Sequence, residues 1–325
     1  MLNRKKIIIL LMIFIFSTSF SSLVWSTENY DDCIFKNMKG IGSDLGAIEI
    51  IDLCKARHIN SKSSICFEID AQTINGIIFL QDINEPYSGN NLCKYTNGQV
   101  KSKGNIKNGK LDGKSTKWSA NGQIWTEELY IEGNLVDKTK YSYYENGEMQ
   151  SEAHYINGKL EGIWTYWYES NQKGSEENYK DGKQDGKSTT WYENGMKFSE
   201  KNYKDGKQDG KSTEWYANGQ IWSEENYKDG KQDGKSTEWH ANGEMKSETH
   251  YKDSKLEGIQ TYWYENGHIK SEKNYKDGKQ DGKSTEWYAN GQIKSEKNYK
   301  DGKQDGKSTE WYADGQMLKI VNEIF

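Results

Sequence analysis

The sequence contains one proline, four cysteines and five histidines among its 325 residues. It has no Ser/His/Asp order, phosphate-binding loop or zinc-ligand spacing of the kind that predicts an enzyme or a metal site. Apolar residues make up 33% of the chain and charged residues 29%, which excludes a large hydrophobic core. Aromatic residues nevertheless reach 13%, and with so little proline this argues against disorder. We therefore expect a folded, non-enzymatic protein with no catalytic, cofactor-binding or metal-binding residues.

The charge is nearly balanced, with 44 basic and 49 acidic residues and a net charge of −5. The two signs are mixed along the chain, so no basic patch is available to release counterions from nucleic acid. We expect no nucleic-acid partner. Attraction to anionic lipid is weakly supported for the same reason.

The N-terminus has the pattern of a signal peptide over residues 1–26. Arg4, Lys5 and Lys6 precede an apolar run over 7–16, and the following residues turn small and polar up to Ser26. This predicts export to the periplasm, the outer envelope or the extracellular space, with cleavage after Ser26. The alternative is an uncleaved N-terminal helix that anchors the protein.

The four cysteines, Cys33, Cys54, Cys66 and Cys93, all precede residue 94. An even number in an exported chain predicts disulfides, and we favour Cys33–Cys54 and Cys66–Cys93 among the three pairings. A zinc site is the alternative, but no C-x-x-C spacing is present. Residues 27–64 read as a Cys-containing helical segment, with short helices over 31–39 and 44–57 that a disulfide would hold together. Residues 65–105 read as an N-terminal cap with a first partial repeat.

The rest of the chain, 106–325, repeats itself every 24 residues. The unit Tyr-Lys-Asp-Gly-Lys-Gln-Asp-Gly-Lys-Ser-Thr-Glu-Trp-Tyr-Ala-Asn-Gly begins at Tyr275, and related units begin every 24 residues from Tyr155 to Tyr299. A fixed period of this length is typical of repeat arrays, in which each unit packs only on its neighbours. We expect about nine units, each a β-hairpin. The fold class is then mainly β: an elongated, single-layer antiparallel array with a small disulfide-linked helical segment before it.

Each unit contains two turn signals. The Asp-Gly-x-x-Asp-Gly run provides turn glycines, and Asn-Gly between strand-like runs predicts a two-residue hairpin turn. Such a turn would pair Trp287 with Lys294, and would place Tyr288, Ile293 and Tyr299 on one face with Trp287 on the other. Asn171 and Ser254 each replace a turn glycine, so their hairpins should be the least regular. The predicted turn glycines are Gly182, Gly186, Gly206, Gly210, Gly230, Gly234, Gly278, Gly282, Gly302 and Gly306.

The pattern Tyr203…Gly206…Gly210…Gly219 resembles the MORN repeat in its bacterial variant. The core Trp-Tyr-x-Asn-Gly-x-Ile/Met-x-Ser-Glu is similar to that of the YwqK-type antitoxin family and related exported proteins. The resemblance covers roughly 94–325. It implies an elongated antiparallel β array used for protein or membrane association, and it does not imply catalysis.

These observations predict an exported repeat protein that mediates protein–protein or envelope-surface interaction. An unknown protein is the expected partner, with envelope lipid or glycan as further candidates. One alternative is a cell-wall glycan- or choline-binding protein that uses its aromatic rows, because Trp-Tyr-x-x-Asn-Gly also resembles choline-binding repeats. Another is an antitoxin or immunity-type protein that neutralises a toxin. The candidate interaction surface consists of Trp164, Trp167, Trp191, Trp215, Trp239, Trp263, Trp287 and Trp311.

Overall fold

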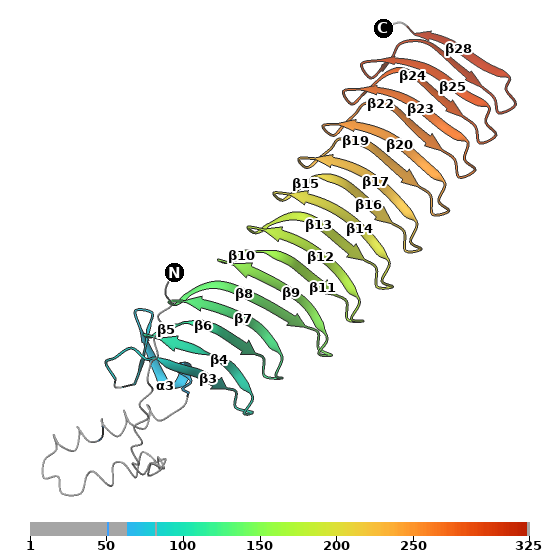
Figure 1. Ribbon diagram of the computed structural model, residues 1–325. Helices are drawn as coiled ribbons and strands as arrows, with labels where there is room; N and C mark the ends of the chain where they lie inside the picture. Colours follow the sequence, from blue (N-terminus) through green and yellow to red (C-terminus); the bar gives the residue numbers. More distant parts are fainter. Residues whose placement is uncertain (1–50, 52–63, 82, 324–325) are drawn as a thin grey trace, which may run out of the picture. The chain divides into compact units, whose positions relative to one another are not determined.

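A computed structural model of the chain describes residues 51, 64–81 and 83–323. The chain divides into two compact units, residues 1–63 and 64–325. The predicted signal peptide and the Cys33–Cys54 disulfide lie outside the described residues. The helical segment expected over 27–64 also falls almost wholly outside them, so the structure gives it no support. Beyond a small cap, the second unit is one long antiparallel sheet, which confirms the mainly-β hairpin array (Figure 1).

The sheet begins at a small cap formed by helix α3 (Phe67–Asp70) and the hairpin of β1 (Ala71–Ile74) and β2 (Ile77–Leu80). Ahead of the helix, the Ile65 amide donates to the Asn90 carbonyl oxygen at 3.0 Å, and the Leu92 amide donates to the Ile65 carbonyl oxygen at 2.6 Å. These bonds pair the outer edge of the first strand of the array, which removes an edge open to aggregation.

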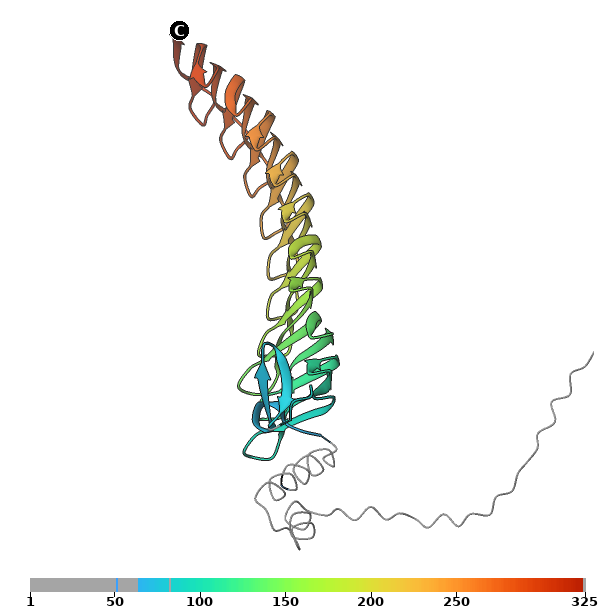
Figure 2. The ribbon, with the colours of Figure 1, turned by 90° about the vertical axis from the view of Figure 1, so that its left-hand side faces the viewer.

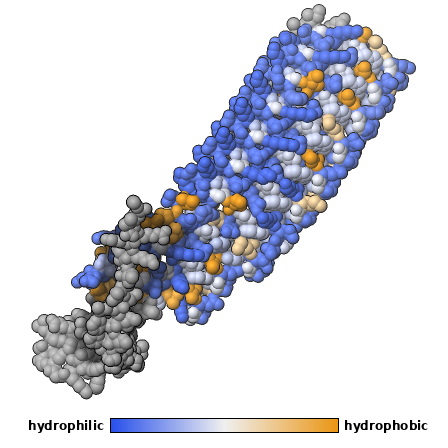
Figure 3. Space-filling model, in the orientation of Figure 1, coloured by the Kyte–Doolittle hydropathy of each residue, from blue (hydrophilic) through white to orange (hydrophobic). Residues whose placement is uncertain are grey.

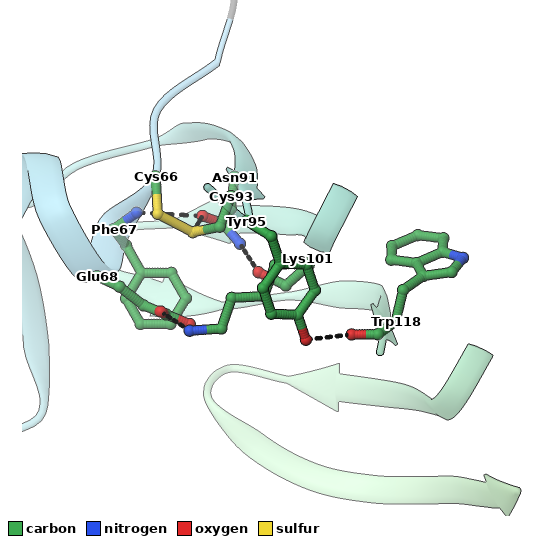
Figure 4. Close-up of polar contacts among 9 residues, drawn as sticks. Cys66, Phe67, Glu68, Asn91, Cys93, Tyr95, Lys101 and Trp118 are labelled. Carbon is green, nitrogen blue, oxygen red and sulfur yellow. Dashed lines mark hydrogen bonds and ion pairs between the residues drawn. A yellow bond between two sulfur atoms is a disulfide. The ribbon is translucent and has the colours of Figure 1, made fainter. Parts of the chain in front are cut away.

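A disulfide joins the cap to the array. The Sγ atoms of Cys66 and Cys93 are 2.03 Å apart, which confirms this predicted pair (Figure 4). Most of the fully buried apolar residues among those described lie at this end of the sheet. They are Ile65, Cys66, Ile78, Leu80, Cys93 and Ile106, with Ala153 further along. The only hydrophobic core in the described part of the chain is therefore the cap, as the composition predicts.

The strands of the array follow one another in chain order (Figures 1 and 2). The long strands pair in sequence, and each two-residue strand pairs with the strand before it, as β5 does with β4 while β4 also pairs with β6. Within the described residues no pairing joins the last strand to the first, so the sheet is open. Over the first part of the array the strands are β3 (Gly89–Lys94), β4 (Val100–Lys107), β5 (Lys110–Leu111), β6 (Gly113–Trp118), β7 (Ile124–Ile131), β8 (Asn134–Tyr143), β9 (Met149–Ile156), β10 (Lys159–Leu160), β11 (Gly162–Trp167), β12 (Lys173–Lys180), β13 (Lys183–Trp191) and β14 (Lys197–Lys204). They continue as β15 (Lys207–Gln208), β16 (Gly210–Trp215), β17 (Ile221–Lys228), β18 (Lys231–Gln232), β19 (Gly234–Trp239), β20 (Met245–Lys252), β21 (Lys255–Leu256), β22 (Gly258–Trp263), β23 (Ile269–Lys276), β24 (Lys279–Trp287), β25 (Ile293–Lys300), β26 (Lys303–Gln304), β27 (Gly306–Trp311) and β28 (Met317–Glu323).

The Asp-Gly turns connect one hairpin to the next. Lys204 pairs with Lys207, so Asp205 and Gly206 form a two-residue loop with φ of 50° and 82°. Positive φ at both central residues defines a type I′ turn, whose twist matches that of the flanking strands. All ten predicted turn glycines have φ between 82° and 112°.

The Asn-Gly turns differ from the prediction. The Tyr288 amide donates to the Gln292 carbonyl oxygen at 2.8 Å, which leaves a three-residue loop over 289–291. Only the glycine of this loop has positive φ, 85° at Gly291, as in a type I turn followed by a bulge. Trp287 consequently pairs with Ile293, and Lys294 occupies a β-bulge. The predicted Trp287–Lys294 pair is therefore wrong, and Ile293 lies on the Trp287 face rather than with Tyr288.

The two turns without glycine are as regular as the others, contrary to expectation. Asn171 adopts φ of 64° and Ser254 adopts 66°, close to the values of the glycines they replace. The Asn171 amide donates to Tyr168, and the Ser254 amide donates to Gln232, as in the neighbouring repeats. The sheet on both sides over-determines these turns, so the residues accept a left-handed backbone instead of distorting it.

The interior of the array contains hydroxyl groups where a globular sheet would contain aliphatic side chains. Ser212 and Thr213 are adjacent on β16 and point to opposite faces, and both are buried. The same positions are buried in most repeats, for example at Ser284 and Thr285. Small side chains at the middle of each strand, with aromatic rings at the ends, thus hold together a single layer that is edge-on in Figure 2.

Candidate functional site

Strand alternation gives the sheet two chemically different faces. Lys211, Thr213 and Trp215 point to one face, and Ser212, Glu214 and Tyr216 point to the other. The first is called the Trp face because each hairpin contributes a tryptophan at the position of Trp215. The second is called the Tyr face because tyrosines occupy two positions of most repeats on it.

The Trp face carries most of the predicted interaction surface. The seven tryptophans at the end of a strand share one position of the repeat and are half-buried. Trp118 belongs to the same row, although its repeat departs from the consensus. Trp164 does not, because it is paired with Glu177 and lies on the Tyr face. The row is formed by Trp118, Trp167, Trp191, Trp215, Trp239, Trp263, Trp287 and Trp311.

The indole N–H groups of this row are free to bind. Among the described residues none of them donates a hydrogen bond, and none is buried without a partner, so each reaches solvent. Tryptophan combines a large apolar surface with one polar donor, which is why it is enriched at protein interfaces.

Ion pairs repeat alongside the row. The Lys187 Nζ lies 2.8 Å from Glu200 Oε1, and the Lys283 Nζ lies 2.6 Å from Glu296 Oε1. Hydrogen bonds from Lys187, and then from Lys197, lower the pKa of Glu200 below its usual value. Exposed pairs of this kind stabilise a protein by only about 0–1 kcal/mol, so their contribution is to the charge pattern of the surface.

Two repeats replace the lysine of this pair with isoleucine. Ile163 and Ile259 occupy the position of Lys187 and Lys283, and their side chains are 53% and 52% exposed. Each lies two residues before Thr and four before a tryptophan of the row, on the same face. Figure 3 shows the apolar residues as separate spots along a mostly hydrophilic array. These two positions could have been found from the sequence, because isoleucine replaces a lysine that recurs at this site in the other repeats.

The Tyr face uses its polar groups internally. The Tyr216 hydroxyl donates to the Trp239 carbonyl oxygen at 2.9 Å, and this bond recurs from Tyr95 to Tyr288 (Figure 4 shows the first). In a second row, three tyrosines donate to a glutamate on the same strand: Tyr130, Tyr179 and Tyr227, with the Tyr179 hydroxyl 2.7 Å from Glu177 Oε2. Burial, and then this hydrogen bond, raises the pKa of Tyr179 to about 12. The tyrosines of the first row join neighbouring repeats, a role that sequence reasoning did not assign to them.

The side chains that could suggest a metal site form a disulfide or accept hydrogen bonds from the backbone. Within the described residues, Cys66, Glu68 and Cys93 form the one cluster of ligand-type side chains, and its two sulfur atoms are bonded to each other. The turn aspartates accept backbone hydrogen bonds, as where the Asp229 amide donates to Asp209 Oδ2 at 3.1 Å. The Asp-Gly-x-x-Asp-Gly pattern is thus explained by turn geometry.

Two observations concern the compartment. The Cys66–Cys93 disulfide indicates an environment outside the reducing cytoplasm. In the part of the chain that the structure describes, no helix is both long and apolar enough to cross a bilayer.

Comparison with known protein families identifies the repeats. The model of the MORN repeat variant family matches nine segments of the chain, which are residues 111–132, 137–157, 160–181, 184–205, 208–229, 232–253, 256–277, 280–301 and 304–322. No curated protein matches.

Solved structures of two toxin-complex assemblies show a weak likeness. TcdB2-TccC3-Cdc42 is 12% identical with a TM-score of 0.22, and TcdB2-TccC3 is 12% identical with a TM-score of 0.23. Each match covers 72% of this chain. The chain spans only 13% and 14% of the length of those two proteins, respectively.

Proposed function

Because the chain belongs to the MORN repeat variant family, we propose that it is an exported, non-enzymatic interaction module whose Trp face binds a partner protein. One observation carries this proposal. A row of half-buried tryptophans with solvent-accessible indole N–H groups recurs at one position of the repeat. The Tyr face offers less, because the phenols of most of its tyrosines are already bonded within the sheet.

The repetition of the row favours a multivalent contact. A partner that engages several adjacent repeats gains affinity from each additional contact without a new binding event in solution. The alternating Lys–Glu pairs beside the row would then set the register and would exclude partners with the wrong charge order. Ile163 and Ile259 mark the places where the ion pair gives way to an apolar contact, and these are the expected centres of the interface.

The test is site-specific photo-crosslinking with the full-length chain in its native envelope. Benzoylphenylalanine replaces Ile163 or Ile259 on the Trp face, and Phe198 or Trp222 serves as the matched position on the Tyr face. All four side chains are exposed. We expect both Trp-face positions to capture the same protein and the Tyr-face positions to capture little of it. Equal capture from the two faces, or no protein adduct from Ile163 and Ile259, would contradict the proposal.

A further inference from the structure

A pocket of about 430 Å³ lies on the Tyr face, between the β22–β23 hairpin and the β24–β25 hairpin. Its side chains include Tyr262, Tyr264, Lys270, Lys273 and Lys294. The volume falls within the range of small-molecule sites. Trp287 of the Trp row also borders the pocket, where its carbonyl oxygen accepts a hydrogen bond from the Tyr264 hydroxyl at 2.8 Å. The tyrosines and the glutamate that line the pocket lie on the Tyr face, opposite the proposed protein interface.

The pocket lies where the sequence of the repeat changes. Where other repeats have glutamate, as at Glu238 and Glu286, this hairpin has Tyr262. Lysines at the bulge position pair with that glutamate: Lys246 Nζ is 3.0 Å from Glu238 Oε2, and Lys294 Nζ is 3.5 Å from Glu286 Oε2.

Lys270 occupies the same bulge position but has no such carboxylate. Its ammonium lies 5.7 Å from the centroid of the Tyr264 ring. Among the described residues, neither Lys270 nor Lys273 forms an ion pair. The substitution thus leaves two cations beside two aromatic rings.

A second hairpin shows what happens without the lysine. Tyr166 corresponds to Tyr262, and Gly174 corresponds to Lys270. A Cβ atom at Gly174 would lie 2.5 Å from Tyr166 Cδ1, so the tyrosine ring covers this glycine. Tyr166 also packs edge-on against Tyr168, with ring centroids 5.7 Å apart. The ring fills the space there. In the β22–β23 hairpin, Lys270 takes the place of that glycine, so the ring of Tyr262 has no equivalent space.

The charges decide which ligand suits the pocket. Three lysines line it against one carboxylate, Glu286, which is already paired with Lys294. A quaternary ammonium such as choline needs an aromatic cage without cations, and here a lysine ammonium occupies the ring face. A carboxylate or phosphate would instead gain charge-assisted hydrogen bonds from Lys270 and Lys273.

We propose that this pocket binds an acidic saccharide, with the acid group at Lys270 and Lys273 and the apolar face of the sugar ring against Tyr262. An aromatic ring accepts the C–H face of a sugar through its negative π face. The site lies open on the surface of the sheet, so a sugar chain can cross it without a lid.

The experiment is calorimetric titration of the full-length protein with tetragalacturonate, and with maltotetraose as the neutral probe. We expect tetragalacturonate to bind and maltotetraose not to bind. Tyr262→Glu restores the common repeat sequence and gives Lys270 a carboxylate, and it should weaken binding about tenfold or more, which corresponds to about 1.4 kcal/mol. Lys270→Gln should weaken binding similarly, whereas Lys246→Gln, at the same position of the preceding hairpin, should leave it unchanged.

Tyr262→Glu follows the other repeats, so its folding is checked by an unchanged thermal midpoint and β circular dichroism. Failure of wild type to bind tetragalacturonate would overturn the proposal. So would equal binding by Tyr262→Glu, equal binding of the neutral probe, or equally tight binding of a polyglutamate peptide. None of these outcomes depends on the crosslinking result at the Trp face, so the two proposals fail separately.

Discussion

The Tyr216 hydroxyl donates a hydrogen bond to the Trp239 carbonyl oxygen, at 2.9 Å, from one repeat to the next. In the following repeat the tyrosine is replaced by His240, and its Nε2 is buried without a hydrogen-bond partner among the described residues. The regular contact between repeats is therefore interrupted at His240, as it is at Ser119 near the start of the array, and at His240 a single substitution can restore it.

His240→Tyr should stabilise the array. The new phenol would bond to the Trp263 carbonyl oxygen as its neighbours do, and the unsatisfied nitrogen would be removed, with a gain of about 1–2 kcal/mol. Urea unfolding followed by circular dichroism measures this as a higher midpoint. Tyr264→His is the matched control and should lower the midpoint. An unchanged midpoint for His240→Tyr would show that these contacts do not limit stability.

Ser254→Gly should also stabilise, because an L-residue in the left-handed region costs roughly 1–2 kcal/mol and Ser254 has φ of 66°. Glycine loses more entropy on folding, and the contact from the Gln232 amide to Ser254 Oγ, 3.2 Å long, is lost. The expected net gain is about 0.5–1 kcal/mol in thermal or urea unfolding. Asn171→Gly should gain less, since asparagine tolerates this conformation better. A larger gain at Asn171 would contradict the explanation.

Loss of the Cys66–Cys93 disulfide should loosen the cap and spare the array. The bond closes a loop with a sequence separation of 27, for which chain entropy predicts about 3–4 kcal/mol. Stability along a repeat array is set by nearest neighbours, so distant hairpins should not respond. Hydrogen exchange of Cys66→Ser/Cys93→Ser should show faster exchange over 64–94 and unchanged protection beyond 203. General loss of β circular dichroism would mean that the cap nucleates the whole sheet.

High pH should weaken the hydrogen bonds between tyrosine and glutamate on the Tyr face. Burial, followed by the hydrogen bond to Glu177, raises the pKa of Tyr179 to about 12, while a tyrosine in the unfolded chain titrates near 10. The stabilisation is thus fully present below about pH 10 and is lost as the pH rises towards about 12. Urea midpoints should fall across this window, and Tyr179→Phe should fall less steeply. Midpoints that stay constant across the window would contradict the raised pKa.

Much of the fold follows from local sequence. Asp205-Gly206 forms the type I′ turn that its residues favour, and the 24-residue period fixes how hairpins succeed one another. The Cys66–Cys93 disulfide is one of the two pairs expected from the even cysteine count and the signal-peptide pattern. Of the candidate interaction surface, the row position was predictable from its spacing, and the placement of Trp164 was not.

The Asn-Gly loop shows where local reasoning stops. By itself Asn-Gly favours a two-residue turn with positive φ at both residues. In the array, Asn290 Oδ1 accepts from the Gln292 amide at 3.1 Å, and Asn290 Nδ2 donates to the Ala313 carbonyl oxygen at 2.8 Å. Asn290 therefore contacts the next repeat, and it does so from the three-residue loop over 289–291.

The sequence alone determined the period, the type of element and the residues at the turns, because these depend on backbone preferences within one repeat. Only the tertiary structure decided which side chains share a face, because one additional loop residue reverses the alternation of the strand that follows. It also decided that Tyr262 borders an open pocket, whereas the ring of Tyr166 fills the equivalent space. The difference lies in the residue across the hairpin, which is Lys270 beside Tyr262 and Gly174 beside Tyr166.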